Sequence, residues 1–162
     1  MRIRGFEKVS YLKEEINLPT SATEGSAGYD FYAYEDVTIE PINETYLDLA
    51  GNIKKEITPT LVKTGIKAYM EDGEFLQLCN RSSNPLKNLL VLANGVGVID
   101  KDYYNNENNE GHIMFQFINI GKKDFIIKKG DKIGQGVFIP FLRADSGNSD
   151  EKRIGGFGSS GK

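Results

Sequence analysis

Short runs of β-branched and aromatic residues alternate along this chain with glycine-rich and polar turns. Within His112 to Phe117, the apolar residues Ile113, Phe115 and Phe117 alternate with others and share one face of an extended segment. Such runs, bounded by turn residues, are typical of strands. The pattern predicts strands over residues 28–34, 37–40, 60–69, 75–80, 89–99, 112–119, 124–128 and 132–141.

Helical periodicity is nearly missing from the chain. Together with 18 glycines, this favours an all-β fold, either a barrel or a sandwich. The best helical candidate is one short turn over residues 83–87, with Ser83 or Asn84 as N-cap and Pro85 in the first turn. Residues 43–58 and 144–152 have no assignable pattern.

Composition limits the possible functions. A chain of 162 residues predicts one domain, and its single cysteine, Cys79, reads as a small buried hydrophobic residue in a reducing compartment. We expect no leader peptide and no membrane span, because no apolar stretch is long enough. A net charge of -3 argues against nonspecific nucleic-acid binding, and one histidine without cysteine pairs argues against a transition-metal site. An anionic small molecule remains a possible ligand.

The stretch from Asn94 to Tyr103 is the centre of the candidate site. It is an apolar strand that runs into Asp100, Asp102 and Tyr103, and with the strand after His112 it predicts a hairpin with an acid and a ring at its mouth. The carboxylates would face opposite sides if the strand continues, so they are not a catalytic pair. An ordinary β-turn begins in the same way, so this stretch alone does not settle the function.

Two other segments have the composition of anion-binding sites. Arg81, Ser82 and Ser83 precede the short helical turn, where hydroxyls and amides either bind a phosphate or simply cap the turn. Residues 155–161 form a Gly-Ser tail with one ring, Phe157; such a tail either cradles phosphate or is a solvated terminus. It lacks the Gly-Lys-Thr or Gly-Lys-Ser ending of a P-loop.

Five segments occur together in an order that resembles one family. They are Ala27-Gly28-Tyr29-Asp30, Arg81-Ser82-Ser83, Asn94 to Tyr103, Gly130 to Gln135, and Arg153 to Gly161. The chain resembles the homotrimeric dUTPases from about residue 6 onward. The resemblance implies a distorted jelly-roll or β-clip barrel over residues 1–143 with one short helix. It also implies a flexible C-terminal arm, residues 144–162, that is exchanged in the trimer and closes over the active site.

The resemblance also implies a role for each matching residue. Asp100 is the general base that activates a water for in-line attack on the α-phosphorus of dUTP, and Tyr103 excludes a 2'-hydroxyl. Mg²⁺ is held by the phosphates and water, with Asp30 in its outer shell and no direct protein ligand. The remaining implied substrate contacts are Arg81, Ser82, Ser83 and Gln135 for phosphates; Asn94, Gly97, Val98, Ile99 and Met114 for uracil; and Arg153, Phe157, Gly158 and Ser159 in the arm.

Several positions depart from the family pattern. Arg153 is four residues before Phe157, and Lys152 takes the fifth place, so either cation could meet the γ-phosphate. Asn88 stands where the family has glycine, and asparagine is the next best residue if positive φ is needed there. Gly134 replaces an alanine. The segments from Asn43 to Thr58 and from Tyr104 to Glu110 are longer than expected. We expect the second to be a surface loop, followed by a partly exposed His112, although either segment could contact a protein partner.

The expected activity is hydrolysis of dUTP to dUMP and pyrophosphate, in the cytoplasm or in a host cytoplasm if the gene is viral. Two alternatives stay open. One is a dCTP deaminase on the same fold, and the other is a nucleotide-responsive regulatory or protein-binding module.

Overall fold

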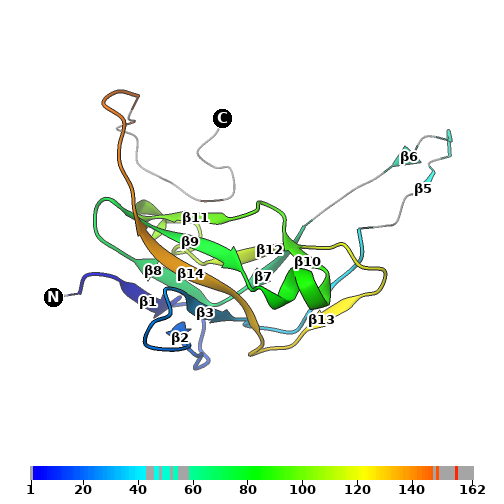
Figure 1. Cartoon of the computed structure of the whole chain (residues 1–162), viewed down its shortest axis with the longest axis horizontal. Helices are drawn as coiled ribbons and strands as arrows, with labels where there is room; N and C mark the ends of the chain where they lie inside the picture. Colours follow the sequence, from blue (N-terminus) through cyan, green and yellow to red (C-terminus); the bar gives the residue numbers. More distant parts are fainter. Residues whose placement is uncertain are drawn as a thin grey trace.

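The structure is a computed structural model of the chain (Figure 1). It describes residues 2–42, 46–47, 49–51, 53–54, 59–147, 149 and 156. Strands dominate the described residues, joined by a short π-helical turn, η1 (Asn84–Asn88), and a 3-10 turn, η2 (Lys101–Tyr103). The strands are β1 (Gly5–Lys8), β2 (Thr20–Ser21), β3 (Tyr29–Tyr32), β4 (Val37–Ile39), β5 (Tyr46–Leu47), β6 (Ile53–Lys54), β7 (Thr60–Lys63), β8 (Ile66–Tyr69), β9 (Glu74–Asn80), β10 (Leu90–Leu92), β11 (Gly97–Asp100), β12 (Met114–Asn119), β13 (Phe125–Ile127) and β14 (Lys132–Pro140).

Two antiparallel sheets form the body of the molecule. One has the strand order β11-β9-β14-β3-β2 and the other β10-β12-β7, while β1-β8, β13-β4 and β5-β6 form separate pairs. Aromatic rings from the two sheets meet in the core: Phe31 of β3 lies 5.6 Å from Phe115 of β12, measured between ring centroids. The all-β prediction is therefore confirmed, with the layered packing of a sandwich.

The predicted alternation in the segment after His112 is also confirmed. Ile113, Phe115 and Phe117 are each at most 1% exposed, whereas Met114 and Gln116 are only partly buried. Each side chain that points inward adds to the apolar core, which is the main stabilising contribution in a sheet of this kind.

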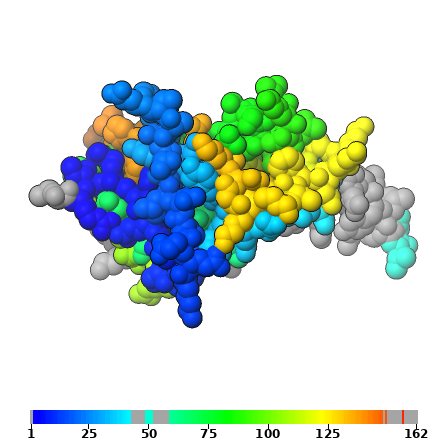
Figure 2. Space-filling model, turned by 90° about the horizontal axis from the view of Figure 1, so that it is seen from below, coloured from blue at the N-terminus to red at the C-terminus, as the bar shows by residue number. Residues whose placement is uncertain are grey.

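The N-terminal segment covers one end of the face seen in Figure 2, where the blue residues lie at the left. Strand β1 pairs with β8, and the backbone N–H of Val9 donates to the carbonyl of Gly65 over 3.0 Å. The sequence pattern did not predict β1 or the two-residue strand β2. Strand β2 has only two residues, and β1, Gly-Phe-Glu-Lys, contains no β-branched residue.

Two predicted strands are each divided in the structure. Residues 60–69 break at Gly65, which has a φ of 74°, so that β7 can pair with β12 and β8 with β1. Residues 89–99 break in a turn at Gly95, which has a φ of 70°. Glycine adopts this left-handed conformation without the steric cost of a side chain. Each break lets the chain move from one sheet to another.

The prediction that residues 94–103 and 112–119 form a hairpin was wrong, because the two segments do not pair with each other. Strand β11 pairs with β9, and β12 pairs with β10 and β7. Of the longer segment 43–58, the described residues include β5 and β6, which pair with each other. No described helix is long and apolar enough to span a bilayer.

Candidate active site

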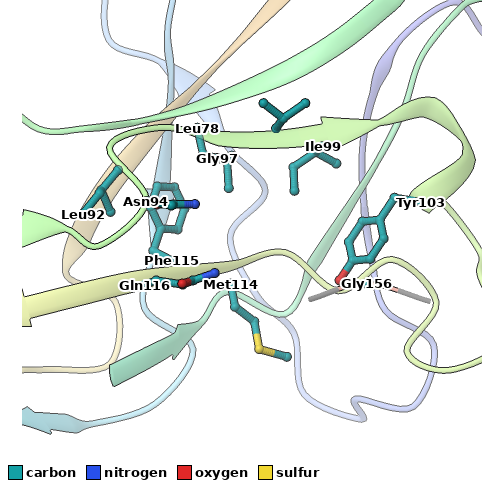
Figure 3. Close-up of a pocket in the computed structure, with 11 residues that line it drawn as sticks. Leu78, Leu92, Asn94, Gly97, Ile99, Tyr103, Met114, Phe115, Gln116 and Gly156 are labelled. Carbon is teal, nitrogen blue, oxygen red and sulfur yellow. The ribbon is translucent and has the colours of Figure 1, made fainter. Parts of the chain in front are cut away.

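A cavity of about 170 Å³ lies between β9, β11 and β12 (Figure 3). Six residues predicted to contact the base or sugar line it together: Asn94, Gly97, Val98, Ile99, Tyr103 and Met114. Sequence reasoning missed Leu78, Leu92, Phe115 and Gln116 as lining residues, and it placed Gly156 only within the tail that could cradle phosphate. Alternation along β12 places Gln116 on the same face as Met114, and this was the available signal.

The turn between β10 and β11 presents polar groups at the edge of this cavity. The N–H of Ala93 donates to the carbonyl of Gln116 over 2.9 Å, and the N–H of Gly95 donates to Leu92 over 3.1 Å. These bonds hold Asn94 at the cavity rim, where its side chain is exposed. An amide side chain both donates and accepts, so a narrow, mostly apolar slot with this group at its edge suits a planar heterocycle.

At Gly97 the backbone approaches the neighbouring strand closely. A Cβ at this position would lie 3.0 Å from both Cβ and Cδ1 of Leu78. Glycine therefore lets β11 pack tightly on β9 beside the cavity. A side chain there would displace Leu78, which is itself part of the cavity wall.

Tyr103 forms one wall and is held at both ends. It is 5% exposed, its hydroxyl donates to the carbonyl of His112 over 2.9 Å, and the Nδ2 of Asn109 donates to that hydroxyl over 2.8 Å. Gly111, with a φ of 83°, packs against the Tyr103 carbonyl, where a Cβ would come within 2.5 Å. A ring fixed in this way cannot move aside to admit a larger ligand.

The loop after Tyr103 differs from the simple surface loop that the sequence predicts. Asn106 is only 7% exposed, and the carboxylate of Glu110 accepts from the N–H of Ser10 over 2.9 Å and from Lys67 Nζ over 2.9 Å. These bonds lower the pKa of Glu110 to about 2, with the Ser10 hydroxyl and N–H as the main causes. The loop is therefore tied to the body rather than free.

His112 is buried rather than partly exposed, which corrects the prediction. It is 2% exposed; its Nε2 accepts from the N–H of Gly65 over 2.8 Å, and its Nδ1 lies 2.7 Å from the Tyr11 hydroxyl. Burial, with a smaller contribution from Lys63, lowers the pKa of His112 to about 4. The imidazole is consequently a neutral structural group at pH 7. Cys79, by contrast, is only partly buried, and the Nε2 of Gln77 lies 3.2 Å from its sulfur.

Asp100 does not line this cavity but a separate groove of about 600 Å³, whereas the residue before it, Ile99, lines the cavity. The strand ends there, because the 3-10 turn begins at Lys101, and Asp102 belongs to that turn. Lys101 Nζ bonds to Asp72 across the groove over 2.6 Å, and that bond is the main cause of the lowered pKa of Asp72. Charged residues of both signs line the groove around Asp100: Asp72, Glu74 and Asp102 are acidic, and Lys101 and Arg143 are basic.

The predicted phosphate contacts gather at the other end of the five-stranded sheet. Gln135 of β14 is opposite Asp30 of β3 and Cys79 of β9, and Lys132 Nζ bonds to Asp30 over 2.7 Å. This hydrogen bond is the main cause of the raised pKa of Lys132. Arg81 Nη1 donates to the carbonyl of Lys132 over 2.9 Å. Arg81, Lys132 and Gln135 thus lie close together near the start of β14.

The helical turn after this segment confirms the predicted element but corrects two details. Ser83 is the N-cap residue and Pro85 lies in the first turn, yet the Ser83 side chain makes no capping hydrogen bond. The simple capping explanation therefore does not account for Ser83. Positive φ falls at Leu89, with a value of 54°, and not at Asn88. The Nδ2 of Asn88 instead donates to Asn84 Oδ1 over 3.2 Å.

Arg81 and Asp100 belong to opposite ends of β9. Asp100 is opposite Phe75, near the beginning of the strand, and Arg81 follows Asn80, its last residue. At about 3.4 Å per residue, Phe75 and Asn80 are roughly 17 Å apart. The bond to Lys132 keeps Arg81 at its own end. One chain therefore does not bring these two groups to the same phosphorus atom.

Four of the predicted arm residues, Arg153, Phe157, Gly158 and Ser159, fall outside the described residues. Gly156 is described, and it lies against the Tyr103 ring, where an added Cβ would be 2.5 Å from Cε2. The described residues contain no group of three or more His, Cys, Asp or Glu side chains arranged to hold a metal ion.

Comparison with known proteins identifies the family that this chain resembles in sequence. A family model described as dUTPase matches residues 14–161. The deoxyuridine 5'-triphosphate nucleotidohydrolase of Lactococcus lactis is 51% identical over 99% of both chains, and that of Haemophilus influenzae is 36% identical over 94% of this chain and 93% of its own.

Solved structures agree with this result. A dUTPase crystal structure from Streptococcus mutans has a TM-score of 0.75 and 44% identity, covering 88% of this chain and 99% of its own. A mutant dUTPase from phage phi11 of S. aureus, described with a structural Mg(II) ion, has a TM-score of 0.67 at 19% identity, covering 91% of this chain and 97% of its own, and this likeness concerns the fold alone. On the match of the family model and of these relatives, the chain belongs to the dUTPase family.

Proposed function

We propose that this chain hydrolyses dUTP to dUMP and pyrophosphate, which limits uracil in DNA and supplies dUMP for thymidylate synthesis. The observation that carries the proposal is the cavity in which Asn94 at the rim and a doubly anchored Tyr103 face one another. The names of the relatives favour this activity over a dCTP deaminase.

Base recognition falls to the rim of the cavity. Asn94 and the backbone around Gly97, Val98, Ile99 and Met114 pair with the uracil edge. Cytosine carries an amino group where uracil has a carbonyl, so it would leave buried polar groups unpaired. An unpaired buried group costs about 1–3 kcal/mol, which makes this kind of discrimination large.

Sugar recognition falls to Tyr103. Its ring lies beneath the deoxyribose, and the bonds to His112 and Asn109 prevent it from tilting away. A ribose 2'-hydroxyl would collide with the ring and lose its hydration, so the site rejects UTP.

Chemistry takes place in the adjoining groove. Asp100 orients a water and accepts its proton as the water attacks the α-phosphorus in line with the leaving pyrophosphate. Arg81, Ser82, Ser83 and Gln135 bind the phosphates and stabilise the charge that develops on them.

Mg²⁺ supplies additional positive charge on the triphosphate. The donors suit an ion that keeps most of its water, because Lys132 already bonds to Asp30 and leaves that carboxylate an outer-shell acceptor. The proposed arm completes the site, with Phe157 stacked on uracil and Arg153, Gly158 and Ser159 at the γ-phosphate. Gly156 lies beside Tyr103 of its own chain, which supports an arm segment at this cavity, although the trimer proposal below assigns that place to the arm of another subunit.

A homotrimer resolves the separation of Arg81 and Asp100. Each site would combine the phosphate-binding residues of one subunit, the Tyr103 cavity and Asp100 of the next, and the arm of the third. Three equivalent sites follow from the closed symmetry of such a ring. The protein would act in the cytoplasm, where its nucleotide substrate is.

The test is release of pyrophosphate from dUTP, dTTP, dCTP and UTP, with and without Mg²⁺, on protein whose mass in solution is known. We expect hydrolysis of dUTP alone, dependence on Mg²⁺ and the mass of a trimer. Ammonia release from dCTP would select the deaminase. No turnover together with tight binding of a protein partner would select a regulatory module.

A further inference from the structure

The loop over residues 104–110 contacts the sugar wall of the cavity directly. Asn109 Nδ2 donates to the hydroxyl of Tyr103 over 2.8 Å, and that hydroxyl donates its own proton to the carbonyl of His112 over 2.9 Å. A hydroxyl has a single proton, so its second bond must come from a donor. Asn109 supplies that donor from outside the motifs that mark the family.

Asn109 is itself held in one orientation. Its Oδ1 accepts from Asn106 Nδ2 over 2.8 Å and from the N–H of Gly111 over 3.1 Å. Two donors at the oxygen leave the Nδ2 end of the amide to face Tyr103. The same Asn106 Nδ2 lies 2.8 Å from the Tyr103 carbonyl, and the Oδ1 of Asn106 accepts from the N–H of Asn109 over 3.2 Å.

The loop is also anchored to the rest of the molecule. The Glu110 carboxylate accepts from the Ser10 hydroxyl over 2.5 Å, and it pairs with Lys67, whose side chain is 10% exposed. Lys67 also bonds to Asn105 over 2.6 Å, and the Tyr104 hydroxyl donates to Glu7 of β1. Partly buried charged bonds of this kind are stronger than exposed ones, so the loop has a fixed position relative to the β1-β8 pair.

We propose that Asn109 is a positioning residue for sugar discrimination, which holds the Tyr103 ring at the depth that excludes a 2'-hydroxyl. The inference rests on the proposed function, and it adds a residue of the longer loop, Asn109, to those that determine the choice between deoxyribose and ribose. With the Asn109 bond lost, the ring keeps its His112 bond but gains freedom to tilt. Ribose then gains room, while the contacts to uracil and the phosphates do not change.

The test is Asn109→Asp. Aspartate keeps an oxygen that can accept from Asn106 and Gly111. It replaces the Nδ2 donor by a second acceptor. The single proton of the Tyr103 hydroxyl already donates to His112, so this hydroxyl cannot also donate to the new acceptor. The matched control is Asn108→Asp, the same substitution in the same loop. Asn108 is exposed, and it bonds to Asn106 through its backbone N–H.

We expect the ratio of kcat/KM for dUTP to that for UTP to fall by about tenfold in Asn109→Asp, the order of one hydrogen bond. It should stay native in Asn108→Asp. Tyr103→Phe removes the hydroxyl that accepts from Asn109, so this variant should also have a lower ratio. In the Tyr103→Phe background, Asn109→Asp should lower the ratio little further, because the bond it affects is already lost. This background keeps the inference testable if Asn109→Asp alone does not fold.

A native ratio in folded Asn109→Asp would overturn the inference, and so would an equal fall in Asn108→Asp, which would indicate an effect of charge alone. Both results leave the proposed function intact, because the native chain still hydrolyses dUTP. A native chain that neither hydrolyses nor prefers dUTP would instead remove the proposed function, and the inference with it.

Discussion

Arg81 and Asp100 flank opposite ends of the same strand, β9, and each is held to its own end by strand pairing or a hydrogen bond. The strand residues beside them, Phe75 and Asn80, are roughly 17 Å apart. At this distance, the side chains of Arg81 and Asp100 from one chain cannot both reach the α-phosphate of a single bound nucleotide. This separation is the reason for the proposal that each active site is shared between chains.

Shared sites predict complementation between two inactive variants. Arg81→Ala and Asp100→Asn should each have almost no activity alone. When equal amounts are unfolded and refolded together, about a quarter of the sites in a randomly mixed trimer combine an intact Arg81 with an intact Asp100 from neighbouring chains. We expect about a quarter of native dUTP turnover. Activity no higher than that of the separately refolded variants would show that each site belongs to one chain.

Replacing the proposed base should separate binding from chemistry. In Asp100→Asn the side chain keeps its shape but cannot accept a proton, so turnover should fall by about 10²- to 10⁴-fold. Affinity for dUTP, measured by calorimetry, should stay near native. The control is Asp72→Asn, which alters an exposed carboxylate in the same groove. Near-native turnover of Asp100→Asn would rule out the assigned role.

The glycine that replaces alanine before Gln135 is explained by packing. A Cβ on Gly134 would overlap the ring of Phe115, which is 1% exposed and lies with its centroid 6.1 Å from that of Phe117. A rigid buried ring cannot move without disturbing its neighbours. Gly134→Ala should therefore lower the free energy of unfolding by about 1–3 kcal/mol, measured in urea. Gly25→Ala, which meets open space, should have little effect.

His112 predicts a dependence of stability on pH. Its pKa is about 4 in the folded chain and near 6.5 when unfolded, so below pH 6.5 the unfolded state binds a proton that the folded state does not. Stability should therefore be complete above pH 6.5 and fall as the pH falls toward 4, by about 2 kcal/mol between pH 7.5 and pH 5.

His112→Gln should show a flatter profile over this range, because glutamine does not titrate and its carbonyl can still accept from Gly65. Glu110 acts in the same direction only at lower pH, between its ordinary value of 4.5 and about 2. Lys63 and Glu35 are the other charged groups that affect His112. Equal slopes for the native chain and His112→Gln would contradict the assignment.

Local pattern was sufficient for the positions of most of the longer strands. The alternation of Phe115 and Phe117 correctly predicted a buried face, because a side-chain period of two depends only on neighbouring residues. The family resemblance carried by the motif around Asn94 and Tyr103 implied a further set of residues, and these line one cavity. Sequence alone thus determined the fold class, the family resemblance and six of the residues that line the cavity.

Tertiary structure decided what depends on distant partners. Gly65 and Gly95 divide two apparently continuous strands because the chain changes sheets there, and β11 pairs with β9 rather than β12. His112 is buried by Tyr11 and Gly65, which are remote in sequence. Local periodicity carries no information on which strands become neighbours, since that is set by the packing of the whole core. The anchored loop at Asn109, and the distance between Arg81 and Asp100, therefore became visible only in three dimensions.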